Sequence, residues 1–200
     1  HAHLDHGGFI PYLYENGYKG PLYCTPPTRD MMVLLCMDYV DVAHKAGKHV
    51  PYSKKSIEKV IKHSIALNYG EVSDIAPNIR LTLQPAGHLL GSSLVHLHVG
   101  EGFHNILYTG DIKCGRTRLL DPPYTDFQRI ETLIIESTYG SSKSYMPPRN
   151  EAEAKLLSAL EDAIKRGGKV LIPSFAVGKP QDIAVTLAQS NFQYPIYFEG

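Results

Sequence analysis

The chain has 200 residues, of which 43% are apolar and 20% are charged, with 20 basic and 20 acidic side chains in balance. This composition is close to the average of globular proteins and excludes a disordered or fibrous chain. The longest apolar run, residues 31–37, is far shorter than the roughly 20 residues that cross a bilayer, and no secretory leader opens the chain. We therefore expect a cytoplasmic protein without a membrane anchor, in which only a local basic patch could attract a polyanion.

Cysteine usage favours the same compartment. The three cysteines are an odd number and lack the CxxC spacing, which is typical of a reducing environment rather than of disulfides. We expect Cys24, Cys36 and Cys114 to pack as small apolar side chains.

The first half of the chain contains two predicted helices followed by short strands. Residues 28–46 are densely apolar and lack glycine and proline, which predicts a long, mostly buried helix. Residues 53–63 predict a second helix with Ser53 as its N-cap. Apolar and histidine side chains alternate in residues 94–99, which predicts a strand with one wetter face. Runs rich in β-branched residues predict further strands at 80–83, 105–108 and 132–135.

From residue 150 onward helices and strands alternate. Asn150 and Glu153 have the spacing of a capping box, and an apolar stripe predicts a helix that ends at the glycine pair 167–168. Residues 169–172 then predict a buried strand, followed by a helix with Pro180 in its first turn. Together the elements predict an α/β sandwich that leads into a second α/β unit.

The first six residues contain four side chains that can bind a metal, namely His1, His3, Asp5 and His6. In an extended segment, residues i and i+2 share a side, so His1 and His3 can chelate one cation together. Asp5 and His6 can face a second cation next to it, past a bend that Gly7 and Gly8 allow. Imidazole and carboxylate ligands suit Zn²⁺, with Mn²⁺ and iron as alternatives.

Two further candidate ligands follow predicted strands. His88 lies in a glycine-flanked turn, and Asp111 ends a Thr-Gly-Asp sequence. Taken alone, either residue is better explained as an ordinary turn residue. Together with the first six residues they complete a set for two metals, with three histidines on one ion, Asp5 and His6 on the other, and Asp111 between them.

This order of motifs resembles the ligand order of the metallo-β-lactamase superfamily. Residues 134–140 (Ile-Ile-Glu-Ser-Thr-Tyr-Gly) resemble the acidic motif that opens the β-CASP insertion, and residues 168–178 resemble a strand and glycine turn inside it. The chain is therefore similar to the β-CASP ribonucleases, and within them to the archaeal homologues of the cleavage and polyadenylation specificity factor nuclease.

The resemblance implies a fold and a division into domains. Residues 1–140 would form an incomplete metallo-β-lactamase αββα sandwich whose N-terminal strands are missing. Residues 141–200 would begin a truncated β-CASP α/β domain, and RNA would pass between the two domains. Two histidine motifs that complete the family's site, one of which supplies a ligand of the second metal, would follow further along the chain.

The resemblance also implies roles for individual residues. His1, His3 and His88 would hold one zinc ion, Asp5 and His6 the other, and Asp111 would bridge the two. Asp5 and Asp111 would thereby take part in catalysis. Glu136 would orient a further histidine that protonates the leaving oxygen, and its alternative role is to cap a turn at the end of a strand.

The implied activity is a two-zinc ribonuclease, endonucleolytic with 5′→3′ exonucleolytic cleavage as a second mode, in RNA 3′-end processing or transcription termination. Its implied partners are RNA, the transcription or RNA-processing machinery, and a second copy of the full-length protein. The alternatives are a scaffold subunit without catalysis and a metallo-hydrolase that does not act on nucleic acids.

Lysines supply the candidate RNA contacts. Residues 44–63 contain six lysines against one glutamate, a patch that could neutralise an RNA backbone or could simply be a solvated helix face. The residues concerned are Lys54, Lys55 and Lys59, together with Lys179, which stands where family members often have arginine.

Overall fold

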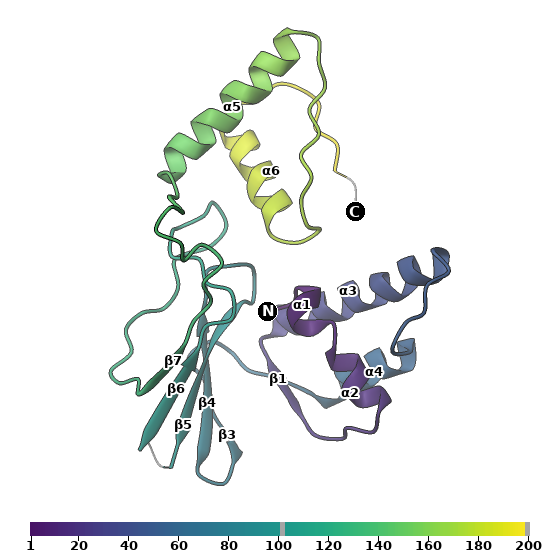
Figure 1. Ribbon diagram of the computed structural model, residues 1–200, viewed down its shortest axis with the longest axis vertical. Helices are drawn as coiled ribbons and strands as arrows, with labels where there is room; N and C mark the ends of the chain where they lie inside the picture. Colours follow the sequence, from purple (N-terminus) through teal and green to yellow (C-terminus); the bar gives the residue numbers. More distant parts are fainter. Residues whose placement is uncertain (101–102, 199–200) are drawn as a thin grey trace.

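The computed structural model describes residues 1–100 and 103–198, which form a mixed α/β structure (Figure 1). Five strands form one sheet in the order β3-β4-β5-β6-β7, and β1 pairs with β2 in a small parallel sheet. The helices are α1 (Leu4–Gly7), α2 (Ile10–Glu15), α3 (Pro26–Lys45), α4 (Lys54–His63), α5 (Arg149–Lys165) and α6 (Lys179–Gln189). The strands are β1 (Leu22–Cys24), β2 (Ser64–Ala66), β3 (Val72–Ala76), β4 (Ile79–Pro85), β5 (Ser93–Val99), β6 (His104–Tyr108) and β7 (Thr132–Ile134).

The α/β class and four of the five predicted strands are confirmed as β4 to β7, whereas β1, β2 and β3 were not predicted. Figure 1 shows α1–α4 on one side of the five-stranded sheet and the α5–α6 pair beyond its upper end. The sheet is antiparallel from β3 to β6, and β7 joins β6 in parallel. Assignment of this arrangement to a metallo-β-lactamase sandwich and a β-CASP domain stays a prediction.

Both faces of the sheet carry buried clusters. Leu81 and Leu83 pack with Val95 on one face, and Leu94 packs with Leu107 on the other. The predicted wetter face of residues 94–99 is therefore wrong. The segment after β6 covers the histidine side of β5, where the ring of Phe127 lies against His96 at a centroid distance of 5.2 Å.

The helices beside the sheet enclose a third cluster around Tyr14, Met32, Cys36 and Ile57. The helix predicted at 28–46 is confirmed as α3, but only one of its faces is buried, and Leu34 on the other face is 67% exposed. Ser53 is the N-cap residue of α4, as predicted, although its hydroxyl donates to Glu15 Oε2 rather than capping the helix.

Close packing of α1 on α3 sets the position of the first six residues. A Cβ atom on Gly7 would lie 2.9 Å from both Cγ and Sδ of Met32, a separation that carbon atoms do not tolerate. Glycine therefore lets α1, with Asp5 and His6 on it, rest directly against α3.

Three predictions for the last sixty residues have different outcomes. The helix with Pro180 in its first turn is confirmed as α6. The capping box at Asn150 is wrong, because α5 already begins at Arg149 and Glu153 pairs with arginines instead. The strand at residues 169–172 is also wrong: this segment has no ladder partner among the described residues, and Leu171 is 88% exposed.

The cysteines are free thiols. Cys24 and Cys36 are buried as predicted, whereas Cys114 is exposed because it lies in the irregular segment between β6 and β7. Within residues 1–100 and 103–198, none of the helices has the length and apolar character that spanning a membrane requires.

Candidate metal centre

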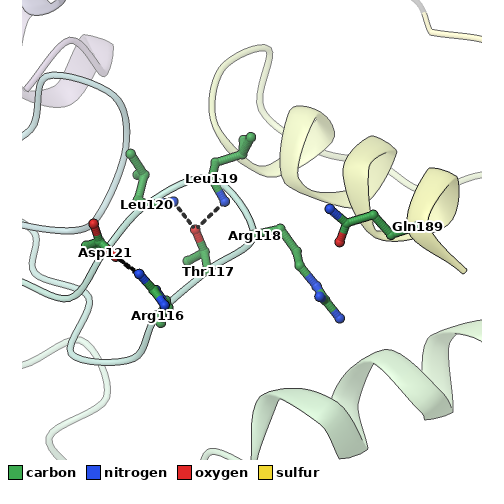
Figure 2. Close-up of a pocket in the computed structure, with 7 residues that line it drawn as sticks. All are labelled: Arg116, Thr117, Arg118, Leu119, Leu120, Asp121 and Gln189. Atoms are coloured by element: carbon green, nitrogen blue, oxygen red, sulfur yellow. Dashed lines mark hydrogen bonds and ion pairs between the residues drawn. The ribbon is translucent and has the colours of Figure 1, made fainter.

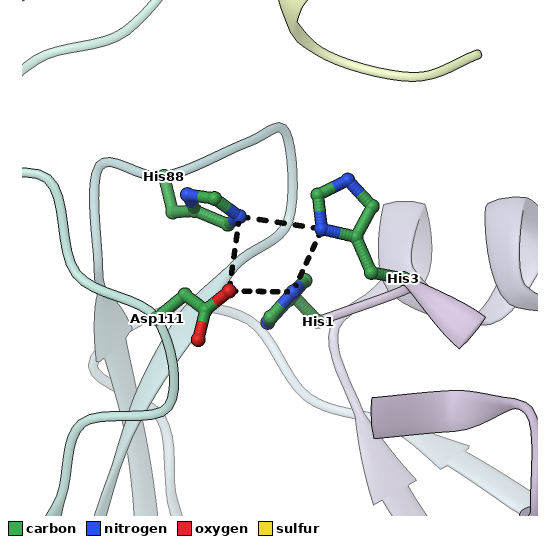
Figure 3. Close-up of side chains that lie close together, drawn as sticks. All are labelled: His1, His3, His88 and Asp111. Carbon is green, nitrogen blue, oxygen red and sulfur yellow. Dashed lines mark hydrogen bonds and ion pairs between the residues drawn. The ribbon is translucent and has the colours of Figure 1, made fainter. Parts of the chain in front are cut away.

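Three histidines from two distant parts of the chain converge on one point. His1 and His3 precede α1, and His88 follows β4. Nδ1 of His3 lies 3.0 Å from Nε2 of His1 and 3.3 Å from Nε2 of His88, as Figure 3 shows. With an oxygen of Asp111, these nitrogens form a group whose members all lie within 4.8 Å of one another.

Two glycines position the loop that carries His88. Gly87 has a φ of 71°, and a Cβ atom there would lie 2.7 Å from the carbonyl oxygen of Lys113. Gly91 has a φ of 82° and would bring a Cβ atom within 2.8 Å of Thr25 Oγ1. Because only glycine adopts this conformation readily and leaves room for such neighbours, the loop can pack against the segments that follow Asp111 and precede α3. Ser92 Oγ then accepts hydrogen bonds from the backbone N–H groups of His88 and Leu89, each at 3.1 Å.

Asp111 divides its two carboxylate oxygens between two sets of histidines. Its Oδ2 lies 3.6 Å from Nε2 of His1 and 3.4 Å from Nε2 of His88. Its Oδ1 lies 3.3 Å from Nε2 of His6. A carboxylate in this position can contact two cations at once, one with each oxygen.

A second group of candidate ligands adjoins the first. It consists of His1, Asp5 and His6, and Asp5 Oδ2 lies 3.7 Å from His6 Nε2. The predicted partnership of Asp5 with His6 is thus present, but Asp5 approaches His1 rather than Asp111. The side chain of Asp5 is 76% exposed, so this group is open to water on one side.

Glu136 holds the backbone next to Asp111. Its Oε1 accepts a hydrogen bond from the Ile112 N–H at 2.9 Å, and its Oε2 accepts one from the Thr138 N–H at 3.1 Å. Hydrogen bonds from the Thr138 side chain and from the Ile112 backbone lower the pKa of Glu136. The carboxylate is therefore charged and fixes the segment that carries Asp111.

Burial lowers the pKa of His88, and this effect outweighs the attraction of Asp111, which raises it. A neutral imidazole is the form that binds metals. Neutral rings carry only one N–H each, so a carboxylate and three ring nitrogens that meet at one point offer more lone pairs than protons. The donor set therefore fits a cation such as zinc, which prefers nitrogen and oxygen ligands in a tetrahedral arrangement.

The lysines of residues 44–63 lie on and around α4, away from His1, His3 and His88. Lys54 Nζ pairs with Asp41 Oδ1 at 2.6 Å, and Lys59 Nζ donates to the Tyr14 carbonyl oxygen at 3.2 Å. Lys55 is exposed on the same helix. Lys179 is different, because it lies close enough to His88 to help lower the pKa of that ring.

Sequence reasoning missed an ionic network between the loop at 116–121 and the two helices α5 and α6. Arg118 Nε donates to Glu153 Oε1 at 2.9 Å, and Arg149 donates to the same oxygen and to Asp182 Oδ2. The spacing of Arg149 and Glu153 is a helical i, i+4 pair that sequence can suggest, but no signal marks Arg118 as their partner.

The same loop borders a surface pocket of about 420 Å³, shown in Figure 2. Its lining polar groups bond to one another: Thr117 Oγ1 accepts from the N–H groups of Leu119 and Leu120, and Arg116 pairs with Asp121. The pocket therefore offers few uncommitted groups to a ligand.

Three archaeal relatives match the chain over its whole length. Proteins called transcription termination factor FttA are 51% identical in Methanothermobacter thermautotrophicus, 53% in Methanocaldococcus jannaschii and 53% in Thermococcus kodakarensis. These close homologues of the chain are therefore FttA proteins. It spans about a third of the length of these relatives, since each alignment covers 32% of the relative and 100% of the chain.

The similarity to FttA confirms the predicted resemblance, because FttA is an archaeal member of the β-CASP family similar to the cleavage and polyadenylation specificity factor nuclease. No protein-family model matches the chain.

Proposed function

We propose that this chain carries the metal centre of a two-zinc ribonuclease that acts in transcription termination or RNA 3′-end formation. The observation that carries the proposal is the position of Asp111, whose two oxygens face His1 and His88 on one side and His6 on the other. A carboxylate shared in this way is the arrangement that a two-metal hydrolase needs.

The ligands follow from the two groups. His1, His3 and His88 would hold one zinc ion with Asp111, and Asp5 and His6 would hold the second with the same carboxylate. When bound, the metal pair supplies an activated water at neutral pH and neutralises the charge that develops on the phosphate.

The chain's own residues prepare this centre. Burial keeps His88 neutral and ready to act as a ligand. Glu136 accepts a hydrogen bond from the Ile112 N–H. Because Ile112 follows Asp111 directly, this bond also sets the direction of the Asp111 side chain. Glu136 is therefore a positioning residue, and its loss would let the shared carboxylate turn away from one of the two sets of histidines.

RNA is the proposed substrate on two grounds. The relatives are named transcription termination factors, and a factor of this kind works where RNA emerges from the transcription machinery. Lys179 lies near His88 and can contact a phosphate there, while Lys54, Lys55 and Lys59 can neutralise the RNA backbone further away.

The test replaces Asp111 by alanine in the whole protein. Zinc content measured by mass spectrometry should fall from about two ions per chain by at least one, and RNA cleavage should be abolished. Asp121→Ala, which removes an exposed aspartate paired with Arg116, is the matched control and should keep both properties. Full zinc content with unchanged cleavage in Asp111→Ala would refute the proposal, and full zinc content in a wild-type protein that cleaves no RNA would favour the scaffold alternative.

A further inference from the structure

The turn before α6 lies over the candidate metal centre. The ring of Phe175 approaches the ring of His3, with centroids 5.8 Å apart and an interplanar angle of 47°. A Cβ atom on Gly178 would lie 3.4 Å from Leu89 Cβ, next to His88. Figure 1 shows this turn, at the lower end of α6, facing the N-terminus of the chain. Two of the three converging histidines therefore have the same turn as a neighbour.

Phe175 is largely exposed to solvent, although its side chain is large and apolar. Its exposed fraction is 71%, although one edge of the ring contacts His3. Burial of such a side chain stabilises a folded protein, and most of this ring is left unburied. Its exposed surface, next to a cluster of polar ligands, is available to a molecule that binds there.

The turn that carries Phe175 is anchored on the side that leads into α6. Gln181 Oε1 accepts from the Gly178 N–H at 2.7 Å, and Gln181 Nε2 donates to the Ala176 carbonyl at 3.1 Å. Asp182 on the same helix accepts a hydrogen bond from the Arg118 N–H at 2.9 Å. The backbone that follows Phe175 is thus held by hydrogen bonds, and the ionic network ties α6 to the part of the chain that carries Asp111.

We propose that Phe175 is a stacking platform for the base next to the phosphate that is cut. This inference rests on the proposed ribonuclease function and adds a substrate class to it: RNA that is single-stranded at that nucleotide. Aromatic rings hold unpaired bases of any sequence, because each base has a π face. A paired base inside an RNA helix has no free face to offer.

A purely structural role is the competing explanation, in which Phe175 only supports the ring of His3. The two roles predict the loss of different properties when Phe175 is replaced. Loss of support for His3 would reduce zinc binding, whereas loss of a stacking platform would reduce RNA binding and leave the zinc in place. Leucine preserves an apolar contact with His3 but has no π face, so Phe175→Leu separates the two.

The experiment measures single-turnover cleavage by the zinc-loaded whole protein over a range of concentrations of a single-stranded oligoribonucleotide. Phe175→Leu should raise the half-saturating concentration by about 5- to 150-fold, the range that the loss of one stacked base gives. Its zinc content should equal that of the wild type, and Phe175→Trp should restore binding. Phe103→Leu is the matched control, because Phe103 is another largely exposed phenylalanine, 82% exposed, at the β5–β6 turn.

A second RNA identifies the stacked base. The same oligonucleotide with the base removed at one position next to the cleavage site should bind the wild type and Phe175→Leu equally. Each of three results would overturn the inference alone. The first is unchanged RNA binding in Phe175→Leu, and the second is loss of zinc in that variant. The third is a difference in binding between the wild type and Phe175→Leu that stays the same whichever base is removed from the RNA. Absence of RNA binding and cleavage in the wild type would instead overturn the proposed function, and the inference with it.

Discussion

Residues 1–140 contain the three apolar clusters that the described residues form, whereas α5 and α6 attach to them through ion pairs among Arg118, Arg149, Glu153 and Asp182. The ligands of the candidate metal centre all belong to the first region, and Phe175 and Lys179, which lie over it, belong to the second. Apolar packing thus holds the donor atoms, whereas the groups proposed to meet the RNA lie on or just before helices that bury only Leu160 and Leu187 among their leucines and depend more on charge. The two regions should therefore respond differently to mutation, pH and salt.

The largest expected effect concerns a ligand in the first region. In the chain as it stands, we expect one zinc ion to bind tightly and a second weakly, because the first group has three imidazoles and a carboxylate while Asp5 in the second is largely exposed. His88→Ala should weaken the tight site by more than the roughly 10–100-fold that loss of an outer-shell partner costs. Calorimetric zinc titration measures both sites, and equal affinities in His88→Ala and the wild type would remove His88 from the ligand set.

Removal of an apolar side chain should lower the free energy of unfolding by several kilocalories per mole more in the first region than in the segment before α6. Ile57 is fully buried among the helices, and Leu171 lies in the exposed segment before α6. Ile57→Ala should lower the free energy of unfolding by about 2–5 kcal/mol, and Leu171→Ala should change it by no more than about 0.5 kcal/mol. Urea denaturation of the metal-free protein gives both values. A large loss in Leu171→Ala would show that the segment before α6 packs against an apolar core.

As the pH falls, α5 and α6 should lose stability before the first region does. Hydrogen bonds from Arg118, followed by those from Arg149, lower the pKa of Glu153 from 4.5 to about 2. Because the folded pKa lies below the unfolded one, the stabilisation is fully present above about pH 4.5 and is lost as the pH falls toward 2. The protection of backbone amides from hydrogen exchange, taken relative to the intrinsic rate at each pH, should therefore fall in α5 and α6 before it does in β4 and β5 in the metal-free protein. Glu153→Gln should show fast exchange in α5 and α6 already at neutral pH, and slow exchange in that variant would contradict this account of the attachment.

The smallest expected effect concerns the lysines. Each phosphate contact that is removed should reduce the slope of log K against log salt by about one unit. Lys55→Ala and Lys179→Ala should each do so when RNA affinity is measured at several salt concentrations. Lys143→Ala, a change of an exposed lysine in the segment between β7 and α5, should leave the slope as it was. An unchanged slope in Lys55→Ala would indicate that α4 simply presents a solvated face.

The sequence indicated the candidate ligands, although metal binding by them stays a prediction. The first six residues place four donors close together in any compact conformation, and the glycine-flanked turn at His88 follows a strand whose pattern is clear. The motifs also placed Asp111 between the two sets of ligands, but which of its oxygens faces which histidines could not be derived, since that depends on where the segment after β6 lies relative to α1.

The errors share a physical cause. The strand predicted at 169–172 has suitable residues, but a strand forms only when a neighbour supplies hydrogen bonds, and no described segment lies beside it. Glu153 has the spacing of a capping box, yet Arg118 and Arg149 offer it charged partners, which bind a carboxylate more strongly than a backbone N–H does. Phe175 near His3 was missed for the same reason, because the contact joins residues that are far apart in the sequence.

The central claim is that Asp111 lies between two metal ions. A crystal structure of the whole protein with zinc, using anomalous diffraction at the zinc edge, tests it most directly. We predict two zinc peaks about 3.5–4 Å apart, one next to His3 and His88 and the other next to Asp5 and His6, with one oxygen of Asp111 directed at each. A single peak with both Asp111 oxygens turned to the same ion, in crystals grown with excess zinc, would contradict the account.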